Sequence, residues 1–400
     1  MRHRALAAYA ALLLISIVWS SNARSAERKL TGSVEIIRGI TVLTLTGSPR
    51  ENGYARGYLL AREVLDGVKG AFDVLLPGNT DYKKISKAIL PALQRTEAHV
   101  QEVEGIVEGL RAKFGGEALA IPRIGRELSA DDFWVLMSLP DVRCSSFAVW
   151  GRMLEGEGML VGRNLDYPGK EVAAASKVLF VYKSPEPGRR SWVDPLPWLI
   201  GVTTGIGEDG VFFSVHDSEN TGKAEPPGHL RFTVLREFLE TVSAKDDLAA
   251  QAGAFFRKHH ILRGTNFLLC GPRAPACVLE YDGNLAKEDG VTVRLPEAGQ
   301  EWIAVTNHFR TRNAPDICPR YAKLEESLKA MAAGGKKIMT MQEAWELLRG
   351  AGKSTTLLSV VFRSADRKLL LSFTDGRSPA HELKPVEFSL DELLGPKAAK

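Results

Sequence analysis

The sequence predicts an α+β protein with a helical N-terminal part and a β-rich remainder. Two observations support this fold class. Residues 49–139 read as mostly helical, whereas from Ser145 onward short apolar runs alternate with glycine-containing turns. Helical pieces then interrupt the strands. Such grouped strands and helices are typical of α+β layers.

The N-terminus has the features of a secretory signal. Arg2 and Arg4 precede an apolar run from Ala5 to Trp19, and small and polar residues follow. The run is shorter than the roughly 20 apolar residues that a membrane span needs. We expect a signal peptide over residues 1–26, with an uncleaved anchor as the alternative. The mature chain should then be periplasmic or secreted, without a stable membrane anchor.

Strands and then helices are predicted after this signal. The β-branched stretch "VEIIRGITVLTLTG" reads as one or two strands. Ser48 and Glu51 have the S-x-x-E spacing of a capping box, and Pro49 suits a first helical turn, so a helix should begin there. A later helix should end at Gly115. Its apolar residues at helical spacing are Val100, Val103, Ile106, Val107 and Leu110.

The β-rich part contains nine apolar runs that predict strands. In chain order they are "SSFAVW", "GMLVGRN", "KVLFVYK", "GVFFSVH", "NFLLC", "CVLEYD", "WIAVTN", "TLLSVVFR" and "KLLLSF". Helices are predicted at "HLRFTVLREFLETV" and "CPRYAKLEESLKAM". Because no repeat and no long linker interrupts the chain, one structural domain is expected.

Composition and motifs exclude several classes of function. The net charge of +4 is spread along the chain, which gives no indication of a nucleic-acid partner. No H-E-x-x-H, CxxC or G-x-S-x-G occurs, so neither a metal site nor a serine hydrolase is expected. The stretch "RGAGKSTT" resembles a phosphate-binding loop, but Leu347 replaces its first glycine. A helix-like segment also precedes it and a strand-like segment follows it, which is the reverse order. No cofactor is predicted.

The chain has four cysteines. Cys270 and Cys277 flank "GPRAPA" between two predicted strands, so they either form a disulfide across a hairpin or stay free. Cys144 and Cys318 would then remain unpaired or pair with each other. An unpaired thiol in an exported protein can be oxidised, so a free Cys144 would indicate a functional role for this residue.

Cys144 opens a predicted strand, and this position suggests a nucleophile. A thiol becomes nucleophilic when a base or a positive charge favours the thiolate. The base could be His216 or His308, as in a thiol hydrolase that is not processed. Alternatively, cleavage of the peptide bond before Cys144 would free an α-amino group with a pKa of about 7.7–8.0, which can act as the base itself.

A second strand supplies charged partners for this thiol. "GMLVGRNLDYP" ends in Arg163 and Asp166. If it runs antiparallel to the strand of Cys144, with "GRMLEGE" as the connection, its end returns to the level of the cysteine. Arg163 and Asp166 could then anchor the amine and the thiolate.

These motifs resemble a known family. "CSSFAVWG" and "GMLVGRNLDYPG", together with a downstream Thr-Asn, resemble the start of the catalytic chain in the linear-amide branch of the N-terminal-nucleophile hydrolases. That branch includes choloylglycine hydrolases, acid ceramidase, N-acylethanolamine acid amidase and the penicillin acyl-coenzyme A acyltransferases. The resemblance covers about Val34 to Phe373. "GSPRENGYARGYLL" resembles the propeptide of the acyltransferase (peptidase C45) subgroup, whereas choloylglycine hydrolases have almost nothing before their cysteine.

The resemblance implies roles for individual residues. Cys144 matches the nucleophile, and Arg163 with Asp166 matches the pair that orients it. Asn307, in "AVTNHF", matches the asparagine that contributes to the oxyanion hole, and Arg320 matches a late arginine of the site. His216 falls at a polar position that varies in the family, with a possible role toward substrate or oxyanion.

The resemblance also implies an overall organisation. It predicts a four-layer αββα sandwich, with two antiparallel sheets between helical layers. The chain would be made as an inactive precursor and cut between Arg143 and Cys144. The products would be a light chain of residues 27–143 and a heavy chain of residues 144–400, which stay associated. The activity implied is hydrolysis or acyl transfer at a linear amide of a small N-acyl substrate, through a thioester on Cys144. The alternatives are the unprocessed Cys/His thiol hydrolase and an inactive exported binding protein of the same fold.

Overall fold

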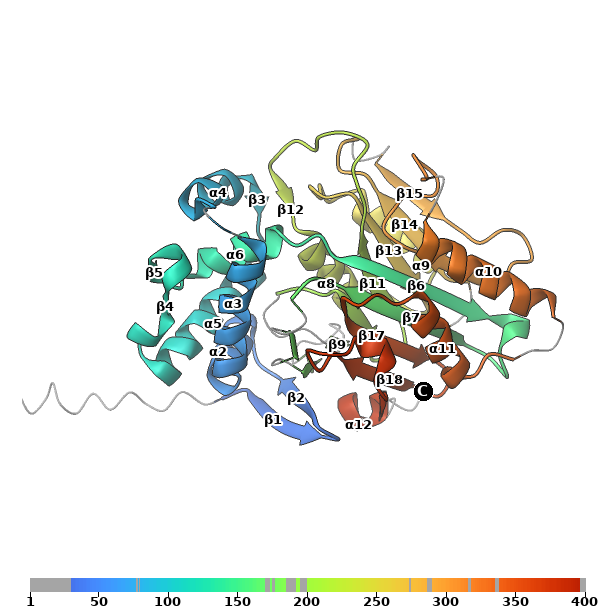
Figure 1. Cartoon of the computed structure of the whole chain (residues 1–400), viewed down its shortest axis with the longest axis horizontal. Helices are drawn as coiled ribbons and strands as arrows, with labels where there is room; N and C mark the ends of the chain where they lie inside the picture. Colours follow the sequence, from blue (N-terminus) through green and yellow to red (C-terminus); the bar gives the residue numbers. More distant parts are fainter. Residues whose placement is uncertain are drawn as a thin grey trace, which may run out of the picture.

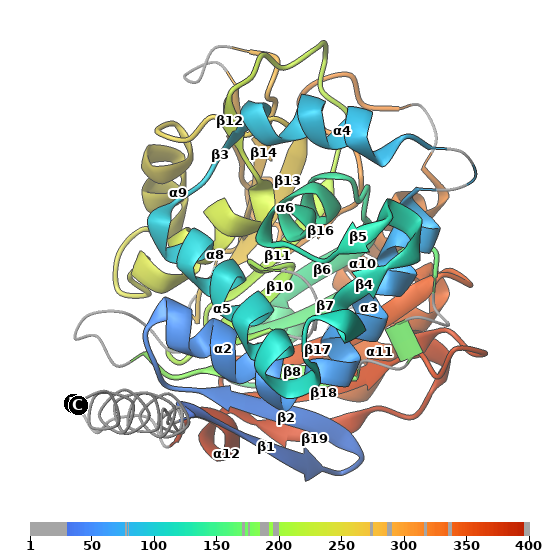
Figure 2. The same ribbon diagram turned by 90° about the vertical axis from the view of Figure 1, so that its left-hand side faces the viewer.

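The computed structural model describes residues 30–76, 78, 80–169, 173–174, 177–184, 192–194, 200–272, 275–285, 290–315, 318–334 and 338–395. The predicted signal peptide lies outside the described residues. Two β-sheets stack face to face, and helices cover both outer faces (Figures 1 and 2). The predicted four-layer αββα sandwich is therefore confirmed.

The first sheet has nine strands in the order β1-β2-β8-β9-β10-β11-β13-β14-β15. Their bounds are Gly32–Ile37, Ile40–Leu45, Val178–Tyr182, Trp192–Asp194, Thr204–Gly207, Phe212–Asp217, Thr265–Cys270, Cys277–Tyr281 and Val291–Arg294. The second sheet has six strands in the order β16-β6-β7-β17-β18-β19. Their bounds are Trp302–Val305, Arg143–Trp150, Met159–Asp166, Thr356–Arg363, Lys368–Phe373 and Val386–Ser389. All nine predicted strands of the β-rich part are present.

One pairing differs from the prediction of two antiparallel sheets. Thr41–Leu45 of β2 pairs in parallel with Val178–Tyr182 of β8, so the larger sheet is mixed. Parallel neighbours need a long crossover connection, and here the whole N-terminal helical segment lies between the two strands. As a result, the part of the chain before Cys144 contributes two strands to the sheet of the part after it.

Each sheet has its own helical layer (Figure 2). Helices α8 (Arg231–Thr241) and α9 (Leu248–Phe256) pack on the nine-stranded sheet. Helices α10 (Pro319–Ala333) and α11 (Met341–Ala351) pack on the six-stranded sheet. Their apolar faces form a small core with that sheet, which includes Phe147, Leu324 and Trp345. The larger apolar core fills the space between the sheets and continues under the N-terminal helices.

The N-terminal helices form a separate group beside the sandwich (Figure 1). They are α2 (Pro49–Leu59), α3 (Ala61–Leu75), α4 (Tyr82–Ile89), α5 (Glu97–Phe114) and α6 (Ala130–Ser138). The predicted capping box begins α2, where the Glu51 carboxylate accepts hydrogen bonds from the Ser48 N–H at 2.9 Å and its hydroxyl at 2.7 Å. Helix α5 ends at Gly115, whose φ of 79° lies in the left-handed region.

Glycines bring α2 and α5 into unusually close contact. A Cβ atom on Gly53 would lie 2.0 Å from the carbonyl oxygen of Glu102, and one on Gly105 would lie 2.3 Å from that of Arg50. Any larger residue would push the two backbones apart. This contact gives a physical reason for the glycines in "GSPRENGYARGYLL".

Candidate active site

The start of β6 and the end of β7 form the centre of the candidate site. The two strands pair antiparallel, with Cys144 opposite Leu165 and Arg143 opposite Asp166. The predicted hairpin therefore returns the Arg163–Asp166 segment to the level of Cys144. Strand β6 also packs against β11 of the other sheet, so the cysteine lies where the two sheets face each other.

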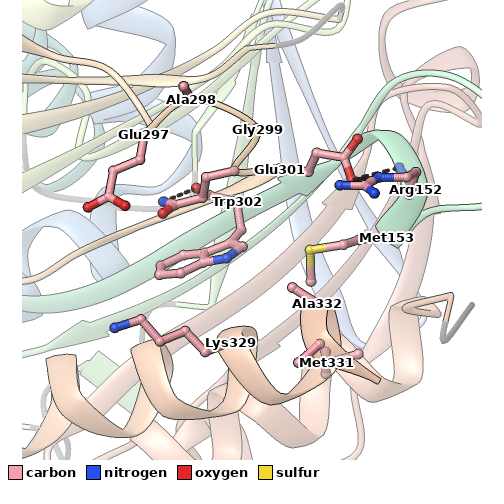
Figure 3. Close-up of a pocket in the computed structure, with 12 residues that line it drawn as sticks. Arg152, Met153, Glu297, Ala298, Gly299, Glu301, Trp302, Lys329, Met331 and Ala332 are labelled. Carbon is pink, nitrogen blue, oxygen red and sulfur yellow. Dashed lines mark hydrogen bonds and ion pairs between the residues drawn. The ribbon is translucent and has the colours of Figure 1, made fainter. Parts of the chain in front are cut away.

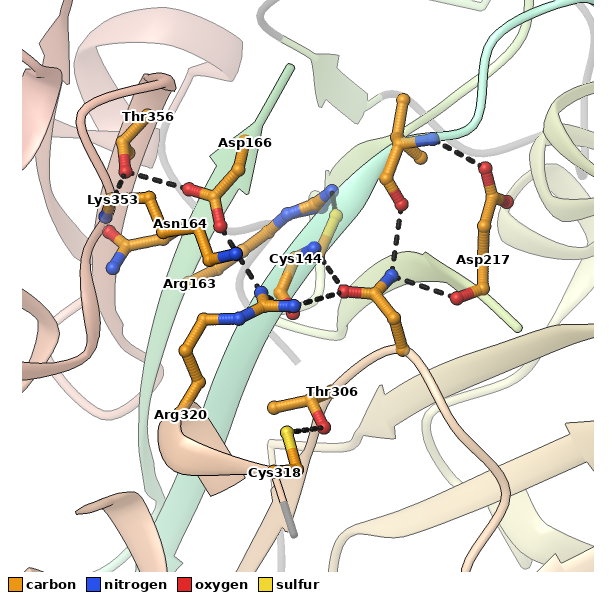
Figure 4. Close-up of polar contacts among 12 residues, drawn as sticks. Cys144, Arg163, Asn164, Asp166, Asp217, Thr306, Cys318, Arg320, Lys353 and Thr356 are labelled. Atoms are coloured by element: carbon orange, nitrogen blue, oxygen red, sulfur yellow. Dashed lines mark hydrogen bonds and ion pairs between the residues drawn. The ribbon is translucent and has the colours of Figure 1, made fainter. Parts of the chain in front are cut away.

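The thiol of Cys144 is fully buried and contacts a guanidinium group. Arg163 Nη2 donates a hydrogen bond to Cys144 Sγ at 3.2 Å (Figure 4). Burial raises the pKa of the Cys144 thiol to about 11, and the positive charge of Arg163 opposes this change only in part. The thiol is thus protonated at neutral pH and inaccessible to solvent.

Arg163 is held in place by the opposite sheet. Its Nη1 donates to the Thr203 carbonyl oxygen at 2.6 Å and to Thr204 Oγ1 at 2.7 Å. Its Nη2 also donates to the Val215 carbonyl oxygen at 3.2 Å. The side chain thus crosses from one sheet to the other and has little freedom to move away from the sulfur. Sequence patterns do not predict these backbone partners, because they come from strands far away in the chain.

Asn307 and Arg320 hold the backbone of Cys144. Asn307 Oδ1 accepts the Cys144 N–H at 2.7 Å, and Arg320 Nη1 donates to the Cys144 carbonyl oxygen at 2.6 Å. Arg320 Nη2 also donates to Asn307 Oδ1 at 2.8 Å. The Asn307 side-chain NH₂ group donates to the carbonyl oxygens of Val142 at 2.9 Å and Asp217 at 2.8 Å. One amide side chain therefore holds both Val142 and Cys144, the two residues that flank Arg143.

Asp166 acts on the site through Arg320. Its Oδ2 accepts from Arg320 Nη1 at 3.2 Å, and its Oδ1 accepts from the Thr356 hydroxyl at 2.7 Å. Burial raises the pKa of the Asp166 carboxyl, whereas the Thr356 hydrogen bond and the charge of Arg320 lower it. The carboxylate thus orients the arginine that holds the Cys144 carbonyl group. Thr356, the first residue of β17, is a site residue that sequence reasoning did not find.

Asp217 and Arg231 form a second buried pair that sequence reasoning also missed. The Val142 N–H donates to Asp217 Oδ2 at 2.6 Å. Arg231 Nη2 donates to the same oxygen at 2.6 Å and to the Pro140 carbonyl oxygen at 2.5 Å. Together they hold the segment just before the candidate cleavage point. Asp217 directly follows His216 in β11.

Neither candidate histidine is bonded to the Cys144 thiol within the described part of the chain. His216 is buried, and its Nε2 lies 3.0 Å from Ser214 Oγ. Burial, together with the charges of Arg163 and Arg320, lowers the pKa of His216 well below its usual value, so the ring is neutral. His308 Nε2 lies 2.9 Å from Thr306 Oγ1. These contacts do not support a Cys144–histidine dyad.

A polar pocket of about 450 Å³ lies beside the candidate cleavage point. Arg143, which is exposed, forms part of its wall. Asn307 and Arg320 line it as well, so the pocket reaches the groups that hold the Cys144 backbone. Ser218 and Cys318 also line this pocket.

A second pocket, of about 460 Å³, lies at the other end of the same strands (Figure 3). It is lined by Trp302, the first residue of β16, and by Arg152 and Met153, which follow β6. Cys144 lies at the opposite end of β6. This second pocket is therefore separate from the candidate active site.

All four cysteines are free thiols. β13 and β14 do form the predicted hairpin, in which Cys277 lies opposite Leu269 rather than Cys270. Of the two alternatives for Cys270 and Cys277, the structure thus has the free thiols. Among the described residues, no group of three or more His, Cys, Asp or Glu side chains is arranged to hold a metal ion. No described helix combines the length and apolarity that a bilayer span requires.

Comparisons with known proteins give distant structural neighbours. No family model and no curated protein matches the chain. Among solved structures, it is similar to a Caenorhabditis elegans N-acylethanolamine-hydrolyzing acid amidase ortholog, with 17% identity and a TM-score of 0.42 over 59% of this chain and 99% of that chain. Penicillin V acylase from Agrobacterium tumefaciens matches with 12% identity and a TM-score of 0.41, over 57% of this chain and 83% of that one.

A mutant of conjugated bile acid hydrolase from Clostridium perfringens matches with 11% identity and a TM-score of 0.41, over 64% of this chain and 95% of that one. All three structures resemble this chain only distantly. At such low identities and TM-scores they assign neither a substrate nor a reaction. The function is therefore inferred from the site itself.

Proposed function

We propose that the chain is an autoproteolytic cysteine amidohydrolase or acyltransferase, which cleaves a linear amide through a thioester on Cys144. One observation carries this proposal. A cysteine at the start of a strand has its thiol bonded to a buried guanidinium, while its N–H and its carbonyl group are each held by a side chain. An ordinary buried cysteine in a β-sheet needs none of these three contacts.

The first reaction would be self-cleavage. Cys144 Sγ adds to the Arg143 carbonyl carbon, and its proton passes to the departing Cys144 nitrogen as the C–N bond breaks. Water then hydrolyses the resulting thioester, which gives the Arg143 carboxylate, the free thiol and a new α-amino group on Cys144. Asp217, Arg231 and Asn307 support this step because they keep the preceding segment in a fixed position.

The products of this cut would be the light chain of residues 27–143 and the heavy chain of residues 144–400. The light chain supplies β1 and β2 to the nine-stranded sheet, and α2 to α6 pack beside it. Strand β3 (Leu93–Gln94) also pairs with β12 (Gly228–His229) of the heavy chain. These contacts favour an associated two-chain protein after cleavage.

Turnover would then use the new amine as the general base. It takes the proton of the thiol, and Sγ attacks the carbonyl carbon of an N-acyl substrate. When the segment around Val142 withdraws, the Asn307 NH₂ group loses the carbonyl acceptor that it holds in the uncut chain. It can then donate to the oxyanion of the tetrahedral intermediate. The protonated amine releases the amine product, and water or another amine takes the acyl group from sulfur.

We further propose that the protein is exported, with the signal peptide of residues 1–26 removed. The order of charged, apolar and small residues in that segment supports this proposal. N-terminal sequencing of the protein from its native host should give two sequences, one beginning near residue 27 and one beginning at Cys144. A heavy-chain sequence that begins anywhere else would contradict the cleavage site.

The activity is tested with a panel of N-acyl amides that vary in acyl length and in the amine. We expect the purified two-chain protein to hydrolyse at least one member, and mass spectrometry of a quenched reaction should show the acyl group on the heavy chain. A processed protein that turns over no acyl amide would instead favour the exported binding protein. Adding a second amine distinguishes acyl transfer from hydrolysis by the product formed.

The Asp217→Asn variant should slow self-cleavage by at least about tenfold. The substitution keeps the shape of the side chain, but it removes the charge that pairs with the buried Arg231 and weakens the acceptor for the Val142 N–H. The rate of appearance of the heavy chain on a gel after cell-free synthesis measures the effect. Asp141→Asn is the matched control, because that carboxylate is partly exposed at the surface and pairs with Arg143 and Arg263. Equal rates in both variants would refute the role of Asp217.

The rate of turnover should increase with pH as the α-amine of Cys144 loses its proton. A free α-amine has a pKa of about 7.7–8.0. Below this pKa the amine is protonated and cannot act as the base, so kcat/KM should fall about tenfold for each pH unit. A profile that stays flat from about pH 5 to pH 8 would exclude the amine as the base.

A further inference from the structure

The segment that carries Asn307 has no regular secondary structure of its own. Strand β16 ends at Val305, and residues 306–312 after it form neither a helix nor a strand. Such segments are normally more mobile than the strands beside them. Asn307 Oδ1 nevertheless accepts the Cys144 N–H at 2.7 Å, and its NH₂ group donates to the Val142 carbonyl oxygen at 2.9 Å. Groups outside the segment must therefore hold Asn307 in this place.

Asn266 of the opposite sheet binds the chain immediately before and after Asn307. Its side-chain NH₂ group donates to the Thr306 carbonyl oxygen at 3.0 Å and to the His308 carbonyl oxygen at 2.8 Å. Asn266 is fully buried and belongs to β13, which has a paired strand on each side in the nine-stranded sheet. The two neighbours of Asn307 are thus attached to the interior of a sheet.

Glu280 continues this attachment further along the segment. Its carboxylate accepts hydrogen bonds from the Arg310 N–H at 2.9 Å and the Thr311 N–H at 3.0 Å, and also from the Thr311 hydroxyl. Glu280 lies directly opposite Asn266 in the pairing of β13 with β14, so the two side chains leave the same face of the sheet. The amide of one residue takes two carbonyl groups, and the carboxylate of the other takes two N–H groups.

Arg294 of β15 completes the connection between the sheets. Its Nε donates to Glu280 Oε1 at 3.0 Å, and its Nη2 donates to the Ala304 carbonyl oxygen in β16 at 2.9 Å. The buried charge of Glu280 therefore has a partner that is itself bonded to the second sheet. Within the described part of the chain, no hydrogen bond joins Asn266, Glu280 or Arg294 directly to Cys144.

We propose that Asn266 and Glu280 are positioning residues, which fix Asn307 for self-cleavage and for amide turnover. This inference rests on the proposed function, in which Asn307 holds the Cys144 backbone and later the oxyanion. A displacement of about 1 Å in a positioned group can lower a reaction rate by about 100-fold. Asn266 and Glu280 contact none of the reacting atoms, and both act through the backbone of residues 306–311.

The attachment itself is tested without any enzymatic activity. In the Cys144→Ala variant, which keeps the chain uncut, hydrogen–deuterium exchange is measured by mass spectrometry with and without Asn266→Leu. Leucine has a similar volume but no N–H group, so peptides that cover residues 306–312 should exchange at least about tenfold faster, while peptides of β7 stay unchanged. Glu280→Gln should accelerate the same peptides, because a donor replaces one of the two acceptor oxygens.

Two results of the exchange experiment would overturn the attachment. Unchanged exchange of residues 306–312 in Asn266→Leu would show that this amide does not hold the segment, and the same result in Glu280→Gln would remove Glu280 from the proposal. Faster exchange across all strands would show general destabilisation instead of a local attachment.

The role in the reaction is tested by rates. Asn266→Leu should slow self-cleavage at least about tenfold and lower kcat of the processed protein similarly, while KM changes less than about twofold, because the loss concerns the transition state. Asn52→Leu is the matched control. Asn52 is also buried, and its NH₂ group donates to the Gly47 carbonyl oxygen at 2.9 Å, at the start of α2. Equal rates in the two variants would refute the positioning role.

A double variant shows whether Asn266 acts through Asn307. In Asn307→Ala the positioned side chain is already absent, so adding Asn266→Leu should slow cleavage by less than about a further twofold. Two effects that multiply in full would show that Asn266 acts independently, which contradicts the proposal. If the wild type neither cleaves itself nor turns over an amide, the proposed function fails while the exchange result stands. If the wild type and Asn266→Leu both cleave normally, only the positioning role fails.

Discussion

Replacing Cys144 with alanine is expected to leave a single uncut chain and to lower amide turnover by at least about 10⁴-fold, the scale on which the loss of a nucleophile acts in other covalent hydrolases. The variant loses the sulfur that Arg163 contacts and the atom that would attack both the Arg143 carbonyl and the substrate. A denaturing gel measures cleavage, and the amide panel measures turnover. The wild type should give two chains on the same gel.

A matched control separates loss of the nucleophile from damage to the core. Cys270→Ala also removes a fully buried sulfur, in the neighbouring sheet, but it should cleave and turn over like the wild type. Circular dichroism should show that both variants fold. Normal cleavage in Cys144→Ala would contradict the assignment of the nucleophile, and a single intact chain in the wild type would contradict self-cleavage.

The sequence predicted much of this fold because each predicted element has a strong local signal. The capping box at Ser48 and the apolar repeat of α5 depend only on neighbours within a few residues. The nine predicted strands are short runs of apolar residues, and all of them formed. Helix α9 was missed because its "LAAQAGAFF" has a glycine and little apolar periodicity. The strands β9, β10, β15 and β19 were also missed; β10, for example, is "TGIG", in which two of the four residues are glycine.

Cys144, Arg163 and Asp166 come together because the hairpin of β6 and β7 connects two motifs that are close in sequence, whereas Asn307 and Arg320 were found only through the family resemblance. Only one connection, residues 151–158, separates the strand of Cys144 from the strand of Arg163. Asp217, Arg231 and Thr356 could not be found in this way, because each reaches the site from a different element and from far away in the chain. The parallel pairing of β2 with β8 was missed for the same physical reason. The residues of a strand do not indicate which distant strand it will pair with.

A buried ion pair between the two parts of the chain is also long-range. Glu102 of α5 is fully buried, and Arg236 of α8 donates to its Oε2 at 2.6 Å. The Tyr182 hydroxyl donates to Glu102 Oε1 at 3.0 Å, and Arg56 lies 4.0 Å from the same oxygen. The Arg56 guanidinium in turn stacks 4.4 Å from the centre of the Phe180 ring. If Arg143–Cys144 is cut, this buried cluster connects the light chain to the heavy chain.

Arg236→Met should therefore lower the free energy of unfolding by about 3–5 kcal/mol, the usual cost of leaving a buried charge without its partner. Glu102 would keep only Tyr182 and the more distant Arg56. Urea unfolding, followed by tryptophan fluorescence, measures this loss, and gel filtration in moderate urea should show the two chains separating earlier than in the wild type. Adding Glu102→Gln should restore part of the stability, because the double variant no longer buries an unpaired carboxylate.

The exposed pair of Arg50 with Glu104 is the matched control for this prediction. Both side chains are partly exposed and both belong to the light chain, so Arg50→Met should leave the unfolding curve nearly unchanged. If Arg236→Met shifts the curve no more than this control, the buried cluster does not hold the chains together. In that case the pairing of β2 with β8 must carry the association, because it is the longest stretch of backbone hydrogen bonds between the two parts.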